Sequence, residues 1–218
     1  MRMTTPDERV RALVRDNVIQ PAEGERLLAT LSPRPSRSGW RLALNPFERF
    51  GGGVAAAAGL AVAGLSLAIT RLGVRFDGFL DLHAAPDVVP MRTALLEQVV
   101  AWLAPALLFW SYARLLRRRV RLIDFVGVTG LARAPLALAG LALGLLAPEA
   151  PAGAVPRLTP ELAVFAVAAT LCLAWFLALL YQAFKNASGL RGAALIAGFI
   201  GLVIASEIVS KVALAHLG

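Results

Sequence analysis

Residues 162–184 read LAVFAVAATLCLAWFLALLYQAF, a run without a charged side chain. A helix needs about 20 apolar residues to cross the roughly 30 Å hydrocarbon core of a bilayer, so this stretch predicts a transmembrane helix. Residues 51–70, GGGVAAAAGLAVAGLSLAIT, form a second charge-free stretch of this kind. Three further stretches, residues 94–113, 122–147 and 192–215, have the length of a span but carry polar interruptions.

The composition of the whole chain is typical of a membrane protein. Of its 218 residues 58% are hydrophobic and 17% charged, and the mean hydropathy is +0.68; a soluble domain has about 45–50% apolar residues. Cys172 is the only cysteine, so the sequence offers no disulfide framework. No apolar stretch lies within the first thirty residues, and we therefore expect no cleaved signal peptide. We predict an all-α fold, a polytopic five-helix membrane bundle.

The positive charges fall unevenly on the predicted loops. With the N-terminus inside, sixteen Lys and Arg lie on the inner side, nine of them before residue 50; the others are Arg114, Arg117, Arg118, Arg119, Arg121, Lys185 and Arg191. The outer side holds Arg71, Arg75, Arg92 and Arg157. Because cytoplasmic loops carry the excess of Lys and Arg, we predict a cytoplasmic N-terminus and an outer C-terminus. The net charge of +8 then reflects topology, and we expect no nucleic-acid partner.

The chain begins with a polar region in two parts. Apolar residues at helical spacing predict a short cytoplasmic helical hairpin over residues 1–31. Residues 32–50 form a linker and an interfacial segment, whose aromatic and arginine residues we expect along the inner membrane surface. Residues 51–218 are the transmembrane domain. Arg-over-Lys and Ala-rich usage suggests a bacterial source, and hence the inner membrane.

Part of the hairpin resembles a known family. Residues 9–31, RVRALVRDNVIQPAEGERLLATL, resemble the SHOCT-like helical hairpin of bacterial membrane and regulatory proteins, and the match lies in the run from Ile19 to Leu28. That family commonly has an acidic pair where Ala22 and Glu23 stand, and Gly24 is a departure that weakens the second helix. The resemblance implies oligomerisation or partner docking without an activity. The alternative is a solvated cytoplasmic tail.

Small residues recur every four positions in three of the predicted spans, and such residues let helices approach closely. These seams favour packing within the chain over dimerisation, and the oligomeric state stays open. Their members are Gly51, Ala55, Gly59 and Ala63 in the first span, Gly140 and Gly144 in the third, and Ala197, Gly201 and Ala205 in the fifth.

Ionisable side chains interrupt the predicted spans, and such residues are functional candidates by default. Glu207 and Lys211 are four residues apart, in the favourable order, and we predict that they pair along one helix. Asp124 lies beside the arginine cluster and is predicted to be an interfacial charge. Glu97 lies near the start of the second span.

Arg133 lies deep in the third span, nine residues after Asp124, so a straight helix would point the two to opposite faces. Pro135 follows and opposes a regular helix. We therefore expect residues 122–133 to form an interfacial or re-entrant half-helix, with the crossing beginning near Pro135. Arg133 would then contact water, a lipid phosphate, or Glu97 or Glu207 on a neighbouring helix.

The sequence offers little catalytic chemistry. It has no Walker-type loop, no Gly-x-Ser-x-Gly elbow and no His-Glu-x-x-His, so we assign no catalytic residue and expect no enzyme. The predicted outer loop holds Asp77, Asp81, His83 and Asp87, which are possible ligands for a divalent metal. A loop with several acids is more often simply solvated, and we predict no metal and no cofactor.

Three stretches carry a second resemblance: NPFERF at 45–50, GLARAP at 130–135 and YQAFKNASGLRG at 181–192. Their order resembles the bacterial branch of the Yip family, membrane proteins named for interaction with Ypt and Rab GTPases, over about residues 45–215. The resemblance implies five helices and a cytoplasmic N-terminus. Rab binding depends on cytosolic segments that this chain lacks, and we do not transfer it.

These observations predict a non-enzymatic integral membrane protein that organises or assists other membrane components. We expect Arg117, Arg118, Arg119 and Arg121 to contact anionic lipid or a membrane-protein partner. The alternative is a transporter, or a transporter subunit, with a polar cavity near Arg133, Glu97 and Glu207. A weaker alternative is a metal or ligand sensor in the outer loop.

Overall fold

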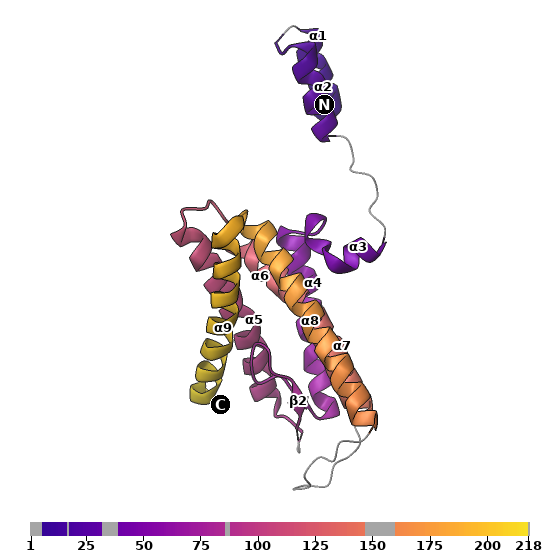
Figure 1. The fold of residues 1–218 in the computed structure, drawn as a ribbon, viewed down its shortest axis with the longest axis vertical. Helices are drawn as coiled ribbons and strands as arrows, with labels where there is room; N and C mark the ends of the chain where they lie inside the picture. The colour runs from indigo at the N-terminus through magenta and orange to yellow at the C-terminus, as the bar shows by residue number, and fades with distance from the viewer. Residues whose placement is uncertain (1–5, 17, 32–38, 86–87, 147–159, 218) are drawn as a thin grey trace. The chain divides into compact units, whose positions relative to one another are not determined.

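A computed structural model describes residues 6–16, 18–31, 39–85, 88–146 and 160–217. The chain divides into two compact units, Met1–Leu42 and Ala43–Gly218, which are described separately. Residues 43–50, the end of the predicted interfacial segment, therefore belong to the second unit, which contains the predicted spans. Figure 1 labels the elements.

The first unit contains α1 (Pro6–Arg15) and α2 (Pro21–Leu31), which pack on each other as the predicted hairpin. Val10 is buried in their contact. A Cβ atom on Gly24 would overlap Cγ2 of Val14. The glycine that weakens the second helix is therefore also the residue that lets the two helices approach. A short helix, α3 (Gly39–Leu44), follows.

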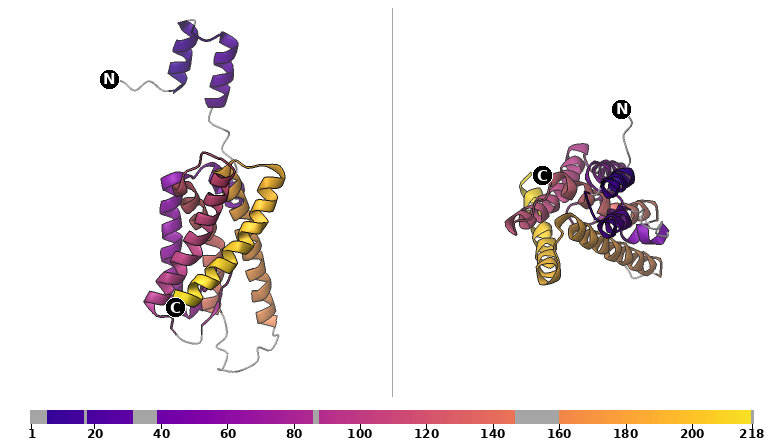
Figure 2. Two further views of the ribbon diagram at one scale, coloured as in Figure 1. Left: turned by 90° about the vertical axis from the view of Figure 1, so that its left-hand side faces the viewer. Right: turned by 90° about the horizontal axis from the view of Figure 1, so that it is seen from above.

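Five helical spans in the described part of the second unit are long and apolar enough to cross a membrane, which confirms the predicted five-helix bundle. They are α4 (Gly52–Ile69), α5 (Met91–Leu115), α6 (Leu122–Ala132) with α7 (Ala134–Leu146), α8 (Pro160–Ser188) and α9 (Gly192–Leu217). Short elements complete the unit: η1 (Pro46–Glu48), η2 (Thr70–Leu72), and the antiparallel strands β1 (Val74–Arg75) and β2 (His83–Ala84). Within this unit, the start of α4 and the end of α9 lie at opposite ends of the bundle (Figures 1 and 2).

Among the described residues, α4 and α6 make the most extensive helix contact, and glycine makes it possible. A Cβ atom on Gly59 would lie 3.0 Å from Cα of Gly130, and one on Gly127 would lie 2.7 Å from the backbone nitrogen of Ala56. The seam predicted on the first span is thus used inside the chain. Its partners Gly127 and Gly130 were not among the predicted seams.

The other two seams differ from this pattern. Gly140 faces Phe76 and the last residue of α4, Ile69, and Gly144 faces Leu72 of η2, so this seam packs against the end of the first span and the segment that follows it. On α9, Gly201 is exposed, and a Cβ atom there would meet nothing within 4 Å. The close approach on this helix is instead made by Gly198, beside the ring of Tyr112.

The helix predicted over residues 122–133 is present as α6 and ends at the predicted break, but its interfacial or re-entrant placement is wrong because it belongs to a longer candidate span. Helices α6 and α7 are separated only by Arg133 and form one candidate span from Leu122 to Leu145. The backbone N–H of Arg133 donates to Gly130, and the N–H groups of Leu136 and Ala137 donate to the carbonyl of Arg133. Pro135 therefore accompanies a local break in the span and does not mark its beginning.

The segment before α4 is fastened to α8. Phe47 is buried in the main core cluster. The indole Nε1 of Trp175 donates to the Ala43 carbonyl at 2.9 Å, and Nδ2 of Asn186 donates to Oδ1 of Asn45 at 3.1 Å. These contacts hold residues 43–48 against the protein, whereas the sequence predicted only an interfacial position.

Candidate functional site

The segment between α4 and α5 folds into the bundle, and residues 73–85 are called the buried loop below. Val74, Phe76 and Phe79 of this loop are almost completely buried. The ring of Phe79 packs edge-on against Phe176 of α8, with the ring centroids 5.4 Å apart. The loop lies at the end of the bundle where α9 terminates (Figure 1).

Side chains from two spans satisfy the backbone of the buried loop. Buried N–H and C=O groups outside helices and sheets need such partners. The N–H of Phe79 donates to Oγ of Ser210 at 3.0 Å, and the N–H of Leu80 donates to Oε2 of Glu207 at 2.8 Å. Polar residues of α9 thus replace the hydrogen bonds that the loop cannot make itself.

Arg133 connects the loop with α5. Its side chain is only 4% exposed, and Nη1 donates to the Ala101 carbonyl at 3.0 Å and to the Phe79 carbonyl at 3.5 Å. Pro105 lies four residues after Ala101 and has no N–H, so the Ala101 carbonyl lacks its helical donor. Arg133 therefore completes a helix that a proline has interrupted. The predicted partners of Arg133, namely water, lipid phosphate, Glu97 or Glu207, do not match these two backbone carbonyls.

Glu97 of α5 is 1% exposed and pairs with the loop residue Arg75, with Oε1 and Nε 2.6 Å apart. Its hydrogen bond to Arg75 raises the pKa of the guanidinium above its ordinary value. The second carboxylate oxygen of Glu97 and both amide atoms of Gln98 are buried without a hydrogen-bond partner. These three polar side-chain atoms of α5 are thus buried without a hydrogen bond, one of them on the residue that binds the loop.

The predicted pair of Glu207 with Lys211 is wrong. Lys211 Nζ instead lies 3.3 Å from Oδ1 of Asp77 and also hydrogen-bonds Asp81. Nδ1 of His83 is 3.5 Å from a carboxylate oxygen of each aspartate. Burial acts to raise the pKa of Asp81, but Lys211 and His83 outweigh it, and the pKa is lowered. The loop thus supplies the carboxylates for Lys211.

The structure does bring together three of the possible metal ligands. The ligand atoms of Asp77, Asp81 and His83 lie within 4.8 Å of one another, and Asp87 is outside the described residues. The ammonium group of Lys211 already pairs with both carboxylates, and the His83 ring lies beside them. This arrangement favours an ion-pair cluster over a cation site.

The three residues of the predicted polar cavity have separate partners. Glu97 binds Arg75, Glu207 binds the backbone of Leu80, and Arg133 binds two carbonyls. Across the described residues, no hydrogen bond or ion pair joins Arg133 to either glutamate. Sequence reasoning assigned no role to Ser210 or Pro105, although Pro105 within a span indicates a carbonyl in need of a donor.

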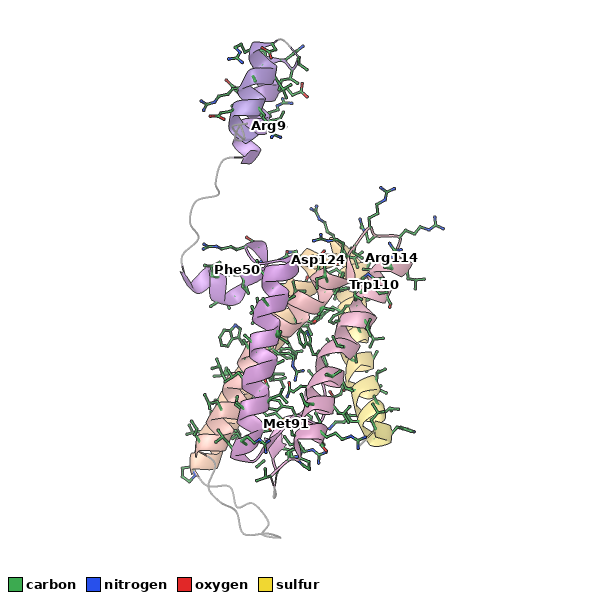
Figure 3. The ribbon with its side chains drawn as sticks, turned by 180° about the vertical axis from the view of Figure 1, so that it is seen from behind. Arg9, Phe50, Met91, Trp110, Arg114 and Asp124 are labelled. Carbon is green, nitrogen blue, oxygen red and sulfur yellow. The ribbon has the colours of Figure 1, made fainter. Side chains whose placement is uncertain are left out.

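The opposite end of the bundle carries the arginine loop, defined as residues 114–121. Figure 3 labels Arg114 and Asp124 at this end, where basic side chains spread away from the helices, and Met91 at the other. Arg121 pairs with Asp124 at 3.0 Å, so Asp124 lies beside the cluster as predicted. Within the part of the chain that the structure describes, Arg114, Arg117, Arg118 and Arg119 are exposed and form no ion pair.

The backbone of this loop puts an arginine where glycine is favoured. Arg117 has φ of 58°, in the left-handed region. Its N–H donates to the Arg114 carbonyl at 2.9 Å, and the N–H of Arg118 donates to Ala113 at 3.0 Å. This is the Schellman ending of a helix, whose left-handed position is usually glycine. An L residue there costs about 1–2 kcal/mol.

No model of a known protein family, no curated protein and no solved structure matches the chain. The Yip-like and SHOCT-like resemblances therefore stay predictions. Of the three Yip-like stretches, the structure brings the first and third into contact through Asn45 and Asn186. The five long apolar helices identify the chain as an integral, multi-pass membrane protein.

Proposed function

We propose that the protein is a non-enzymatic organiser of a bacterial inner membrane, whose arginine loop binds anionic lipid headgroups at the cytoplasmic surface. The observation that carries the proposal is Arg117, an exposed arginine held in a left-handed conformation between exposed, unpaired neighbours. Glycine would fit this position at lower cost, so the side chain itself is the feature that calls for an explanation.

Electrostatics supports this role. A basic residue near an anionic membrane surface contributes about 1 kcal/mol of attraction, and the effect decays within a Debye length. Arg114, Arg117, Arg118 and Arg119 are exposed and have no acidic partner in the described residues. Figure 3 shows Arg114 at one end of the bundle. A guanidinium group binds phosphate through paired N–H donors, and the arginine loop presents several such groups close together.

The charges within the spans support the absence of catalysis. Glu97, Arg133, Glu207 and Lys211 all hold the buried loop or the residues next to it. Their partners are backbone groups and ion pairs of the same chain. This gives the intramembrane charges a structural task that needs no substrate.

The hairpin of the first unit supports partner docking as a second part of this function. Leu13, Val18 and Leu27 expose 40–66% of their surface on a small unit that has little core of its own. A pull-down from native membrane, with the full chain and with a chain lacking residues 1–31, tests this part. Loss of a specific membrane-protein partner on deletion is expected, and an unchanged set of partners would contradict it.

Lipid binding is tested by native mass spectrometry of the purified protein with added phosphatidylglycerol or phosphatidylcholine. The full chain should retain the anionic lipid in preference to the zwitterionic one. The triple variant Arg117→Gln, Arg118→Gln, Arg119→Gln should lose this preference. The matched control, Arg71→Gln with Arg92→Gln, removes two exposed arginines near the other end and should keep it. Equal preference in the triple variant and the control would contradict the proposal.

A further inference from the structure

The buried loop is held at one end of the bundle by carboxylates on both sides of the contact. Glu97 of α5 binds Arg75, and Glu207 of α9 binds the N–H of Leu80. The loop itself contributes Asp77 and Asp81, which bind Lys211 of α9. Each of these four contacts depends on a carboxylate oxygen, and a carboxylate takes up a proton at low pH.

The apolar attachments of the loop contact further helices. Phe79 packs on Phe176 of α8, and Phe76 lies against Gly140 of α7. Ile69 at the end of α4 belongs to the same cluster as Phe76. The loop is therefore wedged among the helices, and its position depends on both packing and charge.

The charges around the loop are close to balance at neutral pH. The cations that face it are Arg133 and Lys211 from the spans and Arg75 from the loop, with His83 beside the aspartates. The anions are Glu97, Glu207, Asp77 and Asp81. Among the described residues, α4 and α7 contain no titratable side chain, and the contact from α8 is the apolar Phe176.

We propose that the buried loop is an acid-released strap, which leaves its place among the helices when the surrounding carboxylates take up protons. Protonation removes the anions but not the cations, so Arg75 and Lys211 lose the carboxylates that bind them, and these two cations and the buried Arg133 repel one another without nearby anions. Withdrawal of the loop carries Arg75 into water and relieves this repulsion. It also frees Glu97, whose Oε2 is buried without a hydrogen-bond partner beside Arg75, to reach water.

Hydrogen exchange followed by mass spectrometry tests the strap in nanodiscs of phosphatidylcholine, whose headgroup charge is neutral. The full chain is measured from pH 7 to pH 3, across the ordinary pKa values of Glu, about 4.3, and Asp, about 3.9. After correction for intrinsic exchange, the Leu80 amide should lose protection by roughly tenfold to a hundredfold, as expected for a lost hydrogen bond to a charged group, and the Phe79 amide, bound to the Ser210 hydroxyl, should lose protection with it when the loop leaves. Peptides from α4, α6 and α8 should keep their protection.

Two variants should release the loop at pH 7. Glu97→Gln leaves Arg75 without its charge partner, and Glu207→Gln keeps an acceptor for Leu80 but removes the charge. Either should raise exchange of the loop amides, and the second is informative if the first does not fold. Asp124→Asn, which removes the partner of Arg121 at the other end, should leave the loop unchanged. Unchanged loop protection down to pH 3, or equal loss in loop and helices, would overturn the proposal.

Discussion

The two ends of the bundle use arginine in opposite ways. Toward the buried loop, Arg133 is buried within its span and its guanidinium donates to two backbone carbonyls, while Arg75 and Lys211 at that end of the bundle each have a carboxylate. At the other end Arg117, Arg118 and Arg119 are exposed and have no acidic partner among the described residues. The difference indicates that the buried cations maintain the fold, whereas the exposed ones are available to something outside the chain.

The largest effect is expected from removing the buried cation. Arg133→Met keeps an unbranched apolar stem but removes the guanidinium, so it leaves the carbonyls of Phe79 and Ala101 without this donor. An unsatisfied buried acceptor costs about 1–3 kcal/mol, so the loss of the donor to two acceptors should cost roughly 2–6 kcal/mol. Thermal unfolding in nanodiscs measures it.

The proline provides a rescue for this variant. Pro105→Ala restores an N–H that can donate to Ala101, so it should recover about half of the loss caused by Arg133→Met. The control is Arg118→Met in the arginine loop, which should leave the melting temperature unchanged. If the two methionine variants were equally stable, the contrast between the two ends would be wrong.

Buried and exposed glycines should also differ in how much their substitution destabilises the protein. Gly127→Ala places a methyl group 2.7 Å from the backbone nitrogen of Ala56 and should destabilise the protein by about 1–3 kcal/mol. Gly201→Ala meets nothing within 4 Å and should be neutral or slightly stabilising. Melting temperatures of the pair, measured in the same nanodiscs, check this. Equal destabilisation by both variants would contradict the assigned packing of α4 and α6.

A smaller effect, of opposite sign, is expected at the exposed end. Arg117→Gly relieves the left-handed conformation and should stabilise the protein by about 1 kcal/mol. The same variant should weaken the preference for anionic lipid, because it removes one guanidinium group. Melting and lipid retention are measured together. A variant that is less stable than the original chain would show that the strain has been wrongly assigned.

The smallest effect concerns Asp81. Its pKa is lowered in the folded protein, so its ion pair adds stability above the ordinary pKa of about 3.9, and this stability is lost as the pH falls through the lowered value. The carboxylate is 39% exposed, so the effect should be less than about 1 kcal/mol and decrease with salt. Asp81→Asn should therefore melt below the original chain at pH 7 and approach it at pH 3. A gap that widens on acidification would contradict the ion pair.

The spans were predictable from the sequence because length and hydropathy are local properties. The partners of the polar residues were not, because they depend on a loop distant in sequence. Glu207 and Lys211 have the spacing of a helical pair, yet the loop brings Asp77 and Asp81 to Lys211 and the N–H of Leu80 to Glu207. Local spacing predicted the wrong partner because a better one comes from elsewhere in the chain.

Arg133 illustrates the same limit. Its depth and the nearby Pro135 were both visible, and they predicted a half-helix that the structure replaces with a break inside one span. The deciding feature is Pro105 on another helix, which leaves the Ala101 carbonyl free. The left-handed backbone of Arg117 was also hidden, because glycine is the usual signal for that position.

The opposite placement of the two ends is tested most directly by thiol labelling. In a Cys172→Ala background, Arg118→Cys and Arg92→Cys each remove one exposed arginine and add one cysteine. A membrane-impermeant maleimide should label Arg92→Cys in intact spheroplasts and Arg118→Cys only in inverted vesicles. Labelling of both variants from the same side would contradict the account.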